Sequence, residues 1–291
     1  MTRVAAVDLG TNSTRLLVAD VEDGRISEVV RRLRITRLGE GVDRGRRLQE
    51  APMARVYAVL GEYGRELEAL GVTRTLLVAT SAVRDAGNGA DFLGEIERSY
   101  GFTTRLLSGD EEARLTFRGV TAGRSLDEET LVVDIGGGST ELLVGGPEGV
   151  GFHVSLDLGC VRMTERFAED VGAVRAHVRA VLPGLKPRRA IGVAGTVTTI
   201  AALDLGLQVY DAKRVHGHRI SRAGTERELA RLASLRLEER ERLPGLEPER
   251  APVIVAGAAI LAELLVAYGL PEIEASERDI LHGAALAAAE L

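Results

Sequence analysis

The sequence predicts an α/β protein with two related domains, each a mixed β-sheet covered by helices, around an interdomain cleft. Three observations support this fold class. Strand-like and helix-like segments alternate along most of the 291 residues. A β-hairpin with an aspartate before its turn occurs twice, at residues 4–19 and 131–144. The order of segments after each hairpin is similar, which indicates two related halves, and facing domains commonly enclose a ligand cleft.

The first half begins with the hairpin at 4–19, in which two apolar runs flank Asp8-Leu9-Gly10-Thr11-Asn12-Ser13. The helix expected at 52–70 has apolar residues at helical spacing, with Pro52 near its start and Gly71 after its end. The elements predicted after the hairpin alternate between strand and helix: 26–36, 52–70, 74–80, 90–99, 103–107 and 109–121.

The second half repeats this order after the hairpin at 131–144. A charged segment near 207–250, which carries Pro244, Gly245 and Pro248, is expected to form surface helices and loops inserted into this domain. The polar stretch at 123–127 marks the boundary, so the domains are 1–124 and 125–291, and the closing helix could pack back toward the first. The elements predicted after the second hairpin are 150–157, 161–182, 189–194, 196–205, 272–275 and 277–290.

Charge and cysteine content exclude several classes of protein. Acidic residues number 43 and basic residues 37, for a net charge of −6, which argues against a nucleic-acid-binding protein. The single cysteine, Cys160, excludes a disulfide framework and is expected to be buried. The longest apolar run, 253–262, is too short to span a membrane, and the N-terminus lacks signal-peptide features. We therefore expect a cytoplasmic protein that binds no membrane.

The glycine-rich turn of the second hairpin is the strongest candidate for chemistry. Gly136, Gly137 and Gly138 would let backbone N–H groups approach an oxyanion, and Ser139 and Thr140 add hydroxyl donors. Asp134, at the end of the preceding strand, could hold a hydrated Mg²⁺ ion. A plain glycine-rich turn is the alternative, but the flanking Asp and Ser-Thr-Glu favour phosphate binding.

Three further segments could contact phosphate. The first hairpin turn is a weaker version of the second, and its candidate residues are Gly10, Thr11, Asn12, Ser13 and, just beyond, Arg15. Thr80, Ser81 and Arg84 follow a strand, where ligands of α/β sheets commonly bind. Gly195 and Thr196 make the equivalent strand-to-helix transition in the second half. The alternatives are a polar loop for the former segment and a helix N-cap for Thr196.

Two glutamates are candidates for catalysis. Ser108 and Glu111 form a capping box at the start of a helix, so Glu111 has a structural role, whereas Glu112 is not needed for that cap. Glu112 could orient or deprotonate a water molecule, or it could simply complement the helix dipole. Glu141 lies in an apolar run, where a charged residue needs a reason.

An arginine cluster and a histidine pair each have more than one interpretation. Seven arginines between Arg31 and Arg47 are opposed by only Glu40 and Asp43, and could line a solvated strand or steer a polyanion. His216 and His218 would share a strand face, where a structural role or substrate contact is favoured over metal binding.

Together these segments resemble the exopolyphosphatase/guanosine pentaphosphate phosphohydrolase family, within the superfamily of actin, sugar kinases and heat-shock ATPases. The resemblance implies two actin-like (ribonuclease H-like) domains with two phosphate loops. The motifs stand in the family's order over nearly the whole chain: DLGTNSTRLLV, RLGEGVD, TSAVRDAGN, SGDEEARL, VVDIGGGSTELL, LGCVRMTE, GVAGTVTTIAAL and VHGH.

The resemblance implies a hydrolase, dependent on Mg²⁺ or Mn²⁺, that removes terminal phosphate from inorganic polyphosphate or, alternatively, from guanosine pentaphosphate. The family's catalytic glutamate matches Glu112, and the acid that ends its glycine-rich motif matches Glu141. Its phosphate-loop aspartates match Asp8 and Asp134, which with Glu141 form the expected metal ligands, and its arginine matches Arg84.

The sequence departs from the family's pattern in two places, and two other functions are weighed against hydrolysis. Larger members carry extra C-terminal helical domains that this sequence lacks, so we expect activity on short chains. The family's Arg-Glu-Gly before the last helix is Leu281-His282-Gly283 here. A kinase would need an acceptor pocket with an aspartate base, which is not evident, and a non-catalytic sensor would bind substrate without turnover. The apolar helix at 253–270 could pack within the second domain or at a homodimer interface.

Overall fold

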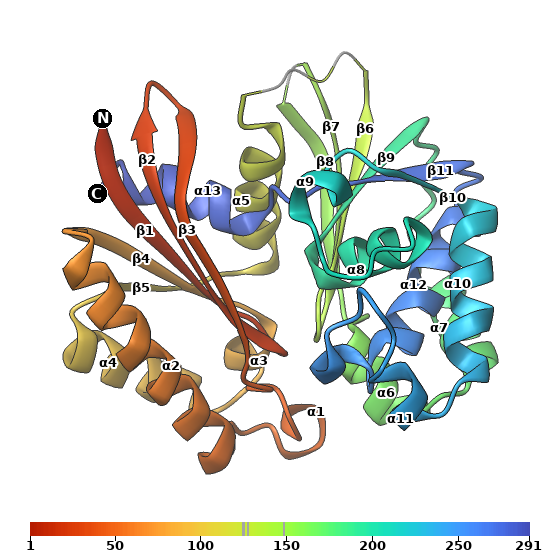
Figure 1. Ribbon diagram of the computed structural model, residues 1–291, viewed down its shortest axis with the longest axis horizontal. Helices are drawn as coiled ribbons and strands as arrows, with labels where there is room; N and C mark the ends of the chain where they lie inside the picture. Colours follow the sequence, from red (N-terminus) through yellow and green to blue (C-terminus); the bar gives the residue numbers. More distant parts are fainter. Residues whose placement is uncertain (124–125, 127, 148) are drawn as a thin grey trace. The chain divides into compact units, whose positions relative to one another are not determined.

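The computed structural model describes residues 1–123, 126, 128–147 and 149–291 (Figure 1). The chain forms two compact units. Unit 1 comprises Met1–Ser125 and Arg278–Leu291, and unit 2 comprises Leu126–Glu277. The domain boundary predicted between residues 124 and 125 lies outside the described residues.

Unit 1 contains a five-stranded mixed sheet in the order β3-β2-β1-β4-β5. The first three strands are antiparallel neighbours, whereas β4 and β5 run parallel to β1. The strands are β1 (Thr2–Leu9), β2 (Ser13–Glu22), β3 (Arg25–Ile35), β4 (Arg74–Ala79) and β5 (Thr103–Leu106).

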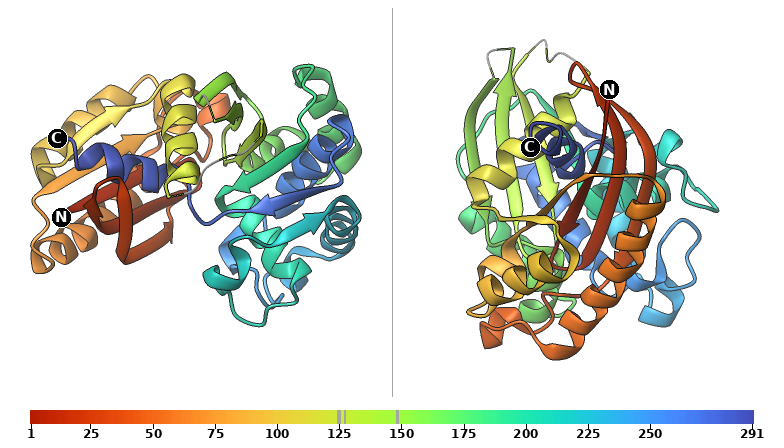
Figure 2. Two further views of the ribbon diagram at one scale, coloured as in Figure 1. Left: turned by 90° about the horizontal axis from the view of Figure 1, so that it is seen from above. Right: turned by 90° about the vertical axis from the view of Figure 1, so that its left-hand side faces the viewer.

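Alternate residues of β1 face two different cores. Ala5 and Val7 belong to the cluster that includes the apolar faces of α2 (Glu50–Ala69) and α4 (Gly89–Tyr100). Val4 and Ala6 belong to the cluster on the other face, which α13 covers (Figure 2). This alternation follows from the two-residue period of a strand. The remaining helices of unit 1 are α1 (Val42–Gly45), α3 (Ser81–Arg84), α5 (Gly109–Thr121) and α13 (Ile280–Ala288).

Two glycines allow α5 and α13 to pack at unusually short range. A Cβ atom on Gly119 would overlap the carbonyl oxygen of Asp279, and one on Gly283 would overlap that of Leu115. Larger side chains at either position would push the helices apart. The contact holds α13 against the sheet of unit 1 although it comes from the far end of the sequence.

Unit 2 contains a six-stranded mixed sheet in the order β10-β11-β9-β6-β7-β8. Strands β6, β9 and β11 are parallel, whereas β7, β8 and β10 are antiparallel to their neighbours. The order β8-β7-β6-β9-β11 repeats that of unit 1, which confirms the prediction of two related α/β domains. The strands are β6 (Thr130–Ile135), β7 (Thr140–Gly146), β8 (Gly149–Leu156), β9 (Arg189–Val193), β10 (Arg219–Ser221) and β11 (Glu272–Ala275).

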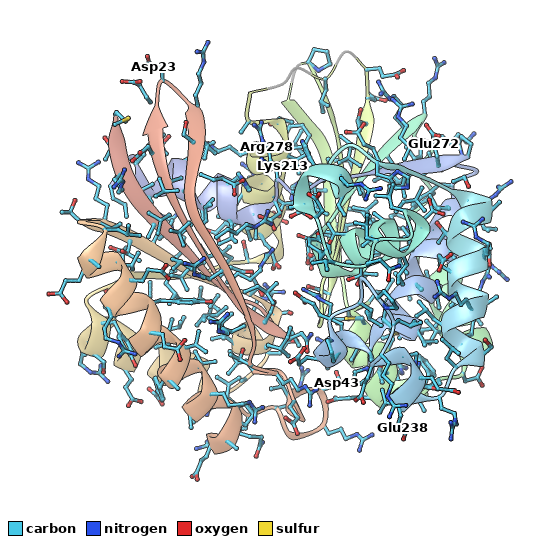
Figure 3. The ribbon with its side chains drawn as sticks, viewed as in Figure 1. Asp23, Asp43, Lys213, Glu238, Glu272 and Arg278 are labelled. Atoms are coloured by element: carbon cyan, nitrogen blue, oxygen red, sulfur yellow. The ribbon has the colours of Figure 1, made fainter. Side chains whose placement is uncertain are left out.

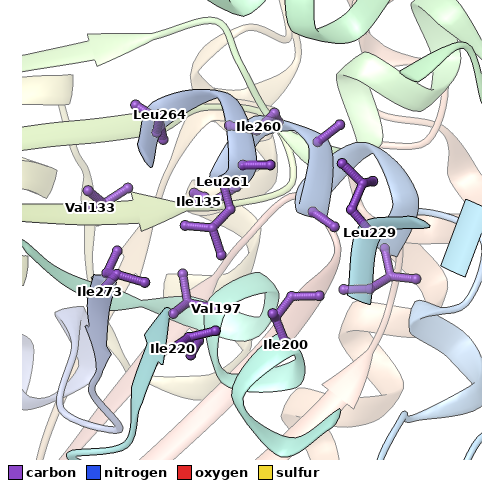
Figure 4. Packing of buried hydrophobic residues seen from close by; sticks show 14 of the residues in the cluster. Val133, Ile135, Val197, Ile200, Ile220, Leu229, Ile260, Leu261, Leu264 and Ile273 are labelled. Atoms are coloured by element: carbon purple, nitrogen blue, oxygen red, sulfur yellow. The ribbon is translucent and has the colours of Figure 1, made fainter. Parts of the chain in front are cut away.

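The core of unit 2 forms around α12 (Ile254–Ala267), whose residues 254–265 are all buried. Ile260, Leu261 and Leu264 of this helix belong to one cluster of buried residues with Val133 of β6 (Figure 4). The other helices are α6 (Cys160–Phe167), α7 (Val171–Val181), α8 (Ala194–Asp204), α9 (Ala212–Val215), α10 (Arg222–Ser234), α11 (Leu237–Arg240) and a 3₁₀ turn (Pro248–Arg250). Within the described residues, no helix is long and apolar enough to cross a bilayer.

Two sequence predictions for unit 2 are wrong in detail. The helix predicted over 161–182 is two helices, because Ala168 adopts a left-handed conformation (φ 53°) and Asp170 caps a new helix by accepting from the Ala173 amide. The segment at 207–250 also contributes the edge strand β10, whose three residues are too few for a visible alternation of apolar and polar side chains.

Candidate active site

The predicted site residues of unit 1 gather at the carboxyl ends of its parallel strands. Strand β1 leads into residues 10–13, here called loop 1, and β4 leads into Thr80 and Ser81. Strand β5 leads into Ser108 and the start of α5. The Thr11 and Ser81 hydroxyls lie 3.0 Å apart and share a hydrogen bond, which joins the first two segments. Ligands of α/β sheets commonly bind at this edge.

Asp8 and Arg15 are direct cross-strand partners in the first hairpin. Arg15 donates to Asp8 Oδ2 from Nε at 2.9 Å and from Nη2 at 2.6 Å. Among the described residues, buried Asp8 Oδ1 has no hydrogen-bond partner. Burial raises the pKa of Asp8, against the opposing effect of Arg15. An orphaned buried carboxylate oxygen fits a role as a cation ligand, since a cation would favour the ionised form.

A buried charged network lies behind Arg15, and the sequence analysis did not find it. Arg15 also donates to Asp279, the N-cap of α13, and Arg31 lies 3.6 Å from the same carboxylate. Burial opposes charge on Asp279, but Arg15, His282 and Arg31 hold its pKa well below the usual range. The network therefore fixes the guanidinium that engages Asp8, so Arg15 is not simply an open phosphate clamp.

His282 closes this network, and its ring is 1% exposed. Its Nε2 lies 3.0 Å from Glu28 Oε1, and its Nδ1 lies 3.5 Å from Asp279 Oδ1. The Asp279 amide also points at Nδ1 at 3.3 Å, a bond that suits the neutral ring. Burial lowers the pKa of His282, but the two carboxylates outweigh it and raise the pKa above its ordinary value.

This raised pKa predicts a pH-dependent stability. The protonated ring favours the folded state, so its contribution is complete below about pH 6.5 and is lost as pH rises through the higher folded pKa. We expect wild-type protein to lose more stability than His282→Gln over this range, since glutamine keeps a capping side chain but does not titrate. Urea unfolding of both proteins from pH 6 to 9 measures the difference, and parallel profiles would contradict the assignment.

The carbonyl groups of loop 1 accept hydrogen bonds from backbone amides of residues 36–39. The Thr36 and Arg37 amides donate to Asn12 O at 3.1 and 3.0 Å, and the Gly39 amide donates to Thr11 O at 2.8 Å. In a trans peptide the C=O and the next N–H point in opposite directions. The amides that follow Thr11 and Asn12 therefore point away from residues 36–39, as an anion-binding turn requires.

Glu112 lies in the first turn of α5 and is 6% exposed. Ser108 and Glu111 form the predicted capping box, which confirms that Glu111 serves the helix end. Arg84 donates from Nη1 to Glu112 Oε2 at 3.1 Å and to the Leu107 carbonyl at 2.8 Å. The geometry thus brings Arg84 and Glu112 together at one strand end.

Residues 136–139 of unit 2, here called loop 2, are held in the same manner by the N-terminus of α6. The Cys160 amide donates to Gly136 O, and the Val161 and Arg162 amides donate to Gly137 O, at 2.9–3.1 Å. Arg162 Nε donates to Gly138 O at 2.7 Å. With these carbonyls turned inward, the amides of residues 137–139 point away from α6.

Loop 1 and loop 2 are each closed by the same kind of backbone hydrogen bond. Gly10 N donates to Ser13 O and Gly136 N donates to Ser139 O, each at 3.0 Å. Predicted phosphate ligand Thr140 is fully buried, and its hydroxyl donates to the Leu158 carbonyl, which anchors loop 2. The backbone amides are therefore better placed than the Thr140 hydroxyl to bind an anion.

Asp134 and Glu141 are direct cross-strand partners in the second hairpin. Both are buried, and Glu141 Oε1 accepts from the Ser155 hydroxyl at 2.8 Å. Like charges directly opposite one another destabilise a sheet, so a cation would be favourable here. No cluster of three or more His, Cys, Asp or Glu suited to a metal occurs in the described ranges. Mg²⁺ needs only one or two carboxylates when water and phosphate supply its other ligands.

A positively charged side chain that was not predicted from the sequence, Arg250, lies at the strand-to-helix transition after β9. The Arg250 guanidinium lies against Gly195, where a Cβ atom would overlap it, and the Arg250 side chain is 15% exposed. Ala194 adopts a left-handed conformation (φ 62°), and Thr196 lies inside α8, so its interpretation as an N-cap is wrong. Arg250 stands alone before an apolar helix, without a motif that could have identified it.

His216 and His218 do not share a strand face as predicted, because they lie between α9 and β10. His216 Nδ1 accepts from the Glu277 amide at 3.2 Å, and His218 Nε2 lies 2.8 Å from Asp204 Oδ2. Cys160 is buried as predicted, and burial raises the pKa of its thiol. His216 and His218 thus have hydrogen-bond partners within unit 2, and Cys160 lies in its interior.

Comparisons with known proteins agree with this arrangement. The sequence profile of the Ppx/GppA phosphatase family matches residues 17–289. Exopolyphosphatase 2 of Mycobacterium tuberculosis is 38% identical, with 99% of each chain covered. The crystal structure of an exopolyphosphatase-like protein superimposes with a TM-score of 0.91 at 35% identity, covering 98% of this chain and 97% of that one. The crystal structure of a Ppx/GppA family member from Aquifex aeolicus superimposes with a TM-score of 0.82 at 30% identity, covering 99% of this chain and 97% of that one. This chain belongs to the Ppx/GppA phosphatase family.

Proposed function

We propose that this protein is an exopolyphosphatase, which hydrolyses the terminal phosphate of inorganic polyphosphate with the help of Mg²⁺ or Mn²⁺. The observation that carries the proposal is loop 2, whose amides point away from α6 beside the buried Asp134–Glu141 pair. Amides of this kind bind phosphate oxygens, and paired carboxylates bind the cation that accompanies them. The M. tuberculosis relative, named an exopolyphosphatase, supports the choice of substrate.

Phosphate binding is assigned to the two loops and to the guanidinium group of Arg250. Loops 1 and 2 supply backbone amides, since their carbonyls are held from behind. Ser139 adds a hydroxyl, and Arg250 adds a guanidinium at Gly195. Arginine suits this role because its planar group can engage two phosphate oxygens at once.

Within unit 2, a cation is assigned to Asp134 and Glu141, and within unit 1, Asp8 Oδ1 is assigned as a cation ligand. When bound, a divalent cation neutralises phosphate charge that would otherwise repel an incoming nucleophile. The carboxylates would hold the cation, while Ser155 fixes one oxygen of Glu141.

Glu112 is assigned as the residue that positions the attacking water. Its carboxylate is buried at the N-terminus of α5 and hydrogen-bonded by Arg84, which restricts its orientation. A fixed carboxylate can accept a hydrogen bond from water and align its lone pair with a phosphorus atom. Electrostatic stabilisation of the transferred group supplies most of the rate acceleration, as in phosphoryl transfer generally.

Phosphate release from polyphosphate and from guanosine pentaphosphate, with Mg²⁺ and with EDTA, tests the proposal. We expect release from polyphosphate that exceeds release from guanosine pentaphosphate and stops when the metal is removed. A preference for guanosine pentaphosphate would contradict the proposed substrate. Tight binding of either compound without release would identify a sensor and contradict the proposed activity.

A further inference from the structure

Residues 36–48, here called the basic strap, connect two segments of the candidate site in unit 1. At one end, the amides of residues 36, 37 and 39 hold the carbonyls of loop 1. At the other end, the Gly87 amide donates to Arg46 O at 2.9 Å. Asn88 exchanges two hydrogen bonds with the backbone of Leu48, at 2.8 and 3.1 Å. The strap therefore runs from loop 1 to the loop that follows Arg84.

The strap is a defined structure rather than a loose surface loop. Leu38, Val42 and Leu48 are at most 4% exposed and belong to the core beneath α2 and α4. The short helix α1 lies within the strap, and Asp43 marks it in Figure 3. Backbone bonds at both ends and buried side chains between them fix the path of the chain.

Four arginines of the strap, by contrast, are exposed: Arg37, Arg44, Arg46 and Arg47. Arg37 and Arg46 adopt left-handed conformations, with φ of 50° and 49°. Such a backbone is unfavourable for a residue with a Cβ atom, and at Arg46 it ends α1 as the C-cap of that helix. In the described part of the chain, no ion pair is found for Arg37, Arg46 or Arg47. Glu40, the nearest acid in sequence to Arg37, pairs instead with Arg55 at 3.0 Å.

We propose that the basic strap is a subsite for the phosphates of a polyphosphate chain that lie beyond those bound near Arg84. The proposal rests on the proposed function, because it assigns a second contact to the same substrate. These arginines outnumber the acids of the strap, Glu40 and Asp43, and a polyanion with one charge per phosphate is attracted to such a local excess of positive charge. The strap ends at the loop that follows Arg84, where the Arg46 carbonyl accepts from the Gly87 amide, so a chain whose terminal phosphates lie near Arg84 can continue onto Arg46 and Arg47.

The double variant Arg46→Gln/Arg47→Gln tests this subsite. The substitutions remove two charges but leave the Arg46 carbonyl bond to Gly87 in place, because that bond uses backbone atoms. We expect KM for long polyphosphate to rise about tenfold, with kcat unchanged and KM for tripolyphosphate within about twofold. An equal rise for both substrates, or no rise for the long chain, would overturn the proposal.

Arg65→Gln/Arg98→Gln is the matched control, since these arginines are exposed on α2 and α4 of the same unit. This control should leave both KM values unchanged, and a rise equal to that of the strap variant would show a general charge effect and overturn the proposal.

A binding measurement separates failure of the subsite from failure of the proposed function. In EDTA, where metal-dependent turnover stops, long polyphosphate should bind the strap variant about tenfold more weakly than wild type, and with a shallower salt dependence. Equal binding by the two proteins would overturn the subsite. Weaker binding by the variant together with a wild-type protein that releases no phosphate would support the subsite while contradicting the proposed activity.

Discussion

Glu112→Ala is expected to lower the rate of phosphate release from polyphosphate by about 10²- to 10⁴-fold. The substitution removes the carboxylate that positions water, and it also leaves Arg84 without its partner at 3.1 Å. The capping box at Ser108 does not involve this side chain, so α5 should still form. Phosphate release under saturating substrate and metal measures the loss, and circular dichroism checks the fold.

Glu111→Ala is the matched control, one residue earlier in the same helix turn. It removes the side chain that accepts from the Ser108 amide at 2.9 Å, so it should cost about 1 kcal/mol of stability. Its effect on the rate should be small, since Glu111 has no place in the proposed chemistry. Near-normal activity of Glu112→Ala, or an equal loss in both variants, would contradict the assignment of Glu112.

Gly159→Ala is expected to disrupt unit 2 and its phosphate site together. A Cβ atom on Gly159 would overlap the backbone of Gly137 and Gly138, so loop 2 would have to move away from α6. Overpacking of this kind costs about 3 kcal/mol. A shift of about 1 Å in the donors should also lower phosphate release by roughly 10²-fold. Thermal unfolding and steady-state kinetics measure the two effects.

Gly184→Ala controls for the loss of a glycine in the same unit. Nothing lies within 4 Å of the Cβ atom that this substitution adds, so stability and activity should remain close to wild type. If Gly159→Ala were as stable and active as Gly184→Ala, the tight contact between loop 2 and α6 would not matter for the site.

The fold class and loops 1 and 2 were predictable because their signals are local. Each hairpin combines apolar runs of strand length with a turn marked by Asp and Gly, and the second copy repeats the first. The capping box at Ser108 and Glu111 is also a local pattern, and it made Glu112 a candidate because the cap does not need that side chain. Features that depend on residues close together in the chain can be predicted from the sequence.

The charged partners of the site could not be predicted because they come from distant segments. Asp279 reaches Arg15 across 264 positions, and Arg250 reaches Gly195 only after α12 and α8 have packed. The break between α6 and α7 depends on the positive φ of Ala168. Alanine favours a continuous helix, and a positive φ is unfavourable for a residue with a Cβ atom, so the sequence does not predict this break. Tertiary structure decides all three features.

The position of α13 has a consequence for synthesis of the protein. Unit 2 is one continuous segment, whereas unit 1 is completed only by residues that follow all of unit 2. Until α13 emerges from the ribosome, the sheet face that Ile280 and Leu281 cover stays exposed, and Arg15 lacks Asp279. Although domains usually fold in the order of their synthesis, here the N-terminal unit is the last to be finished.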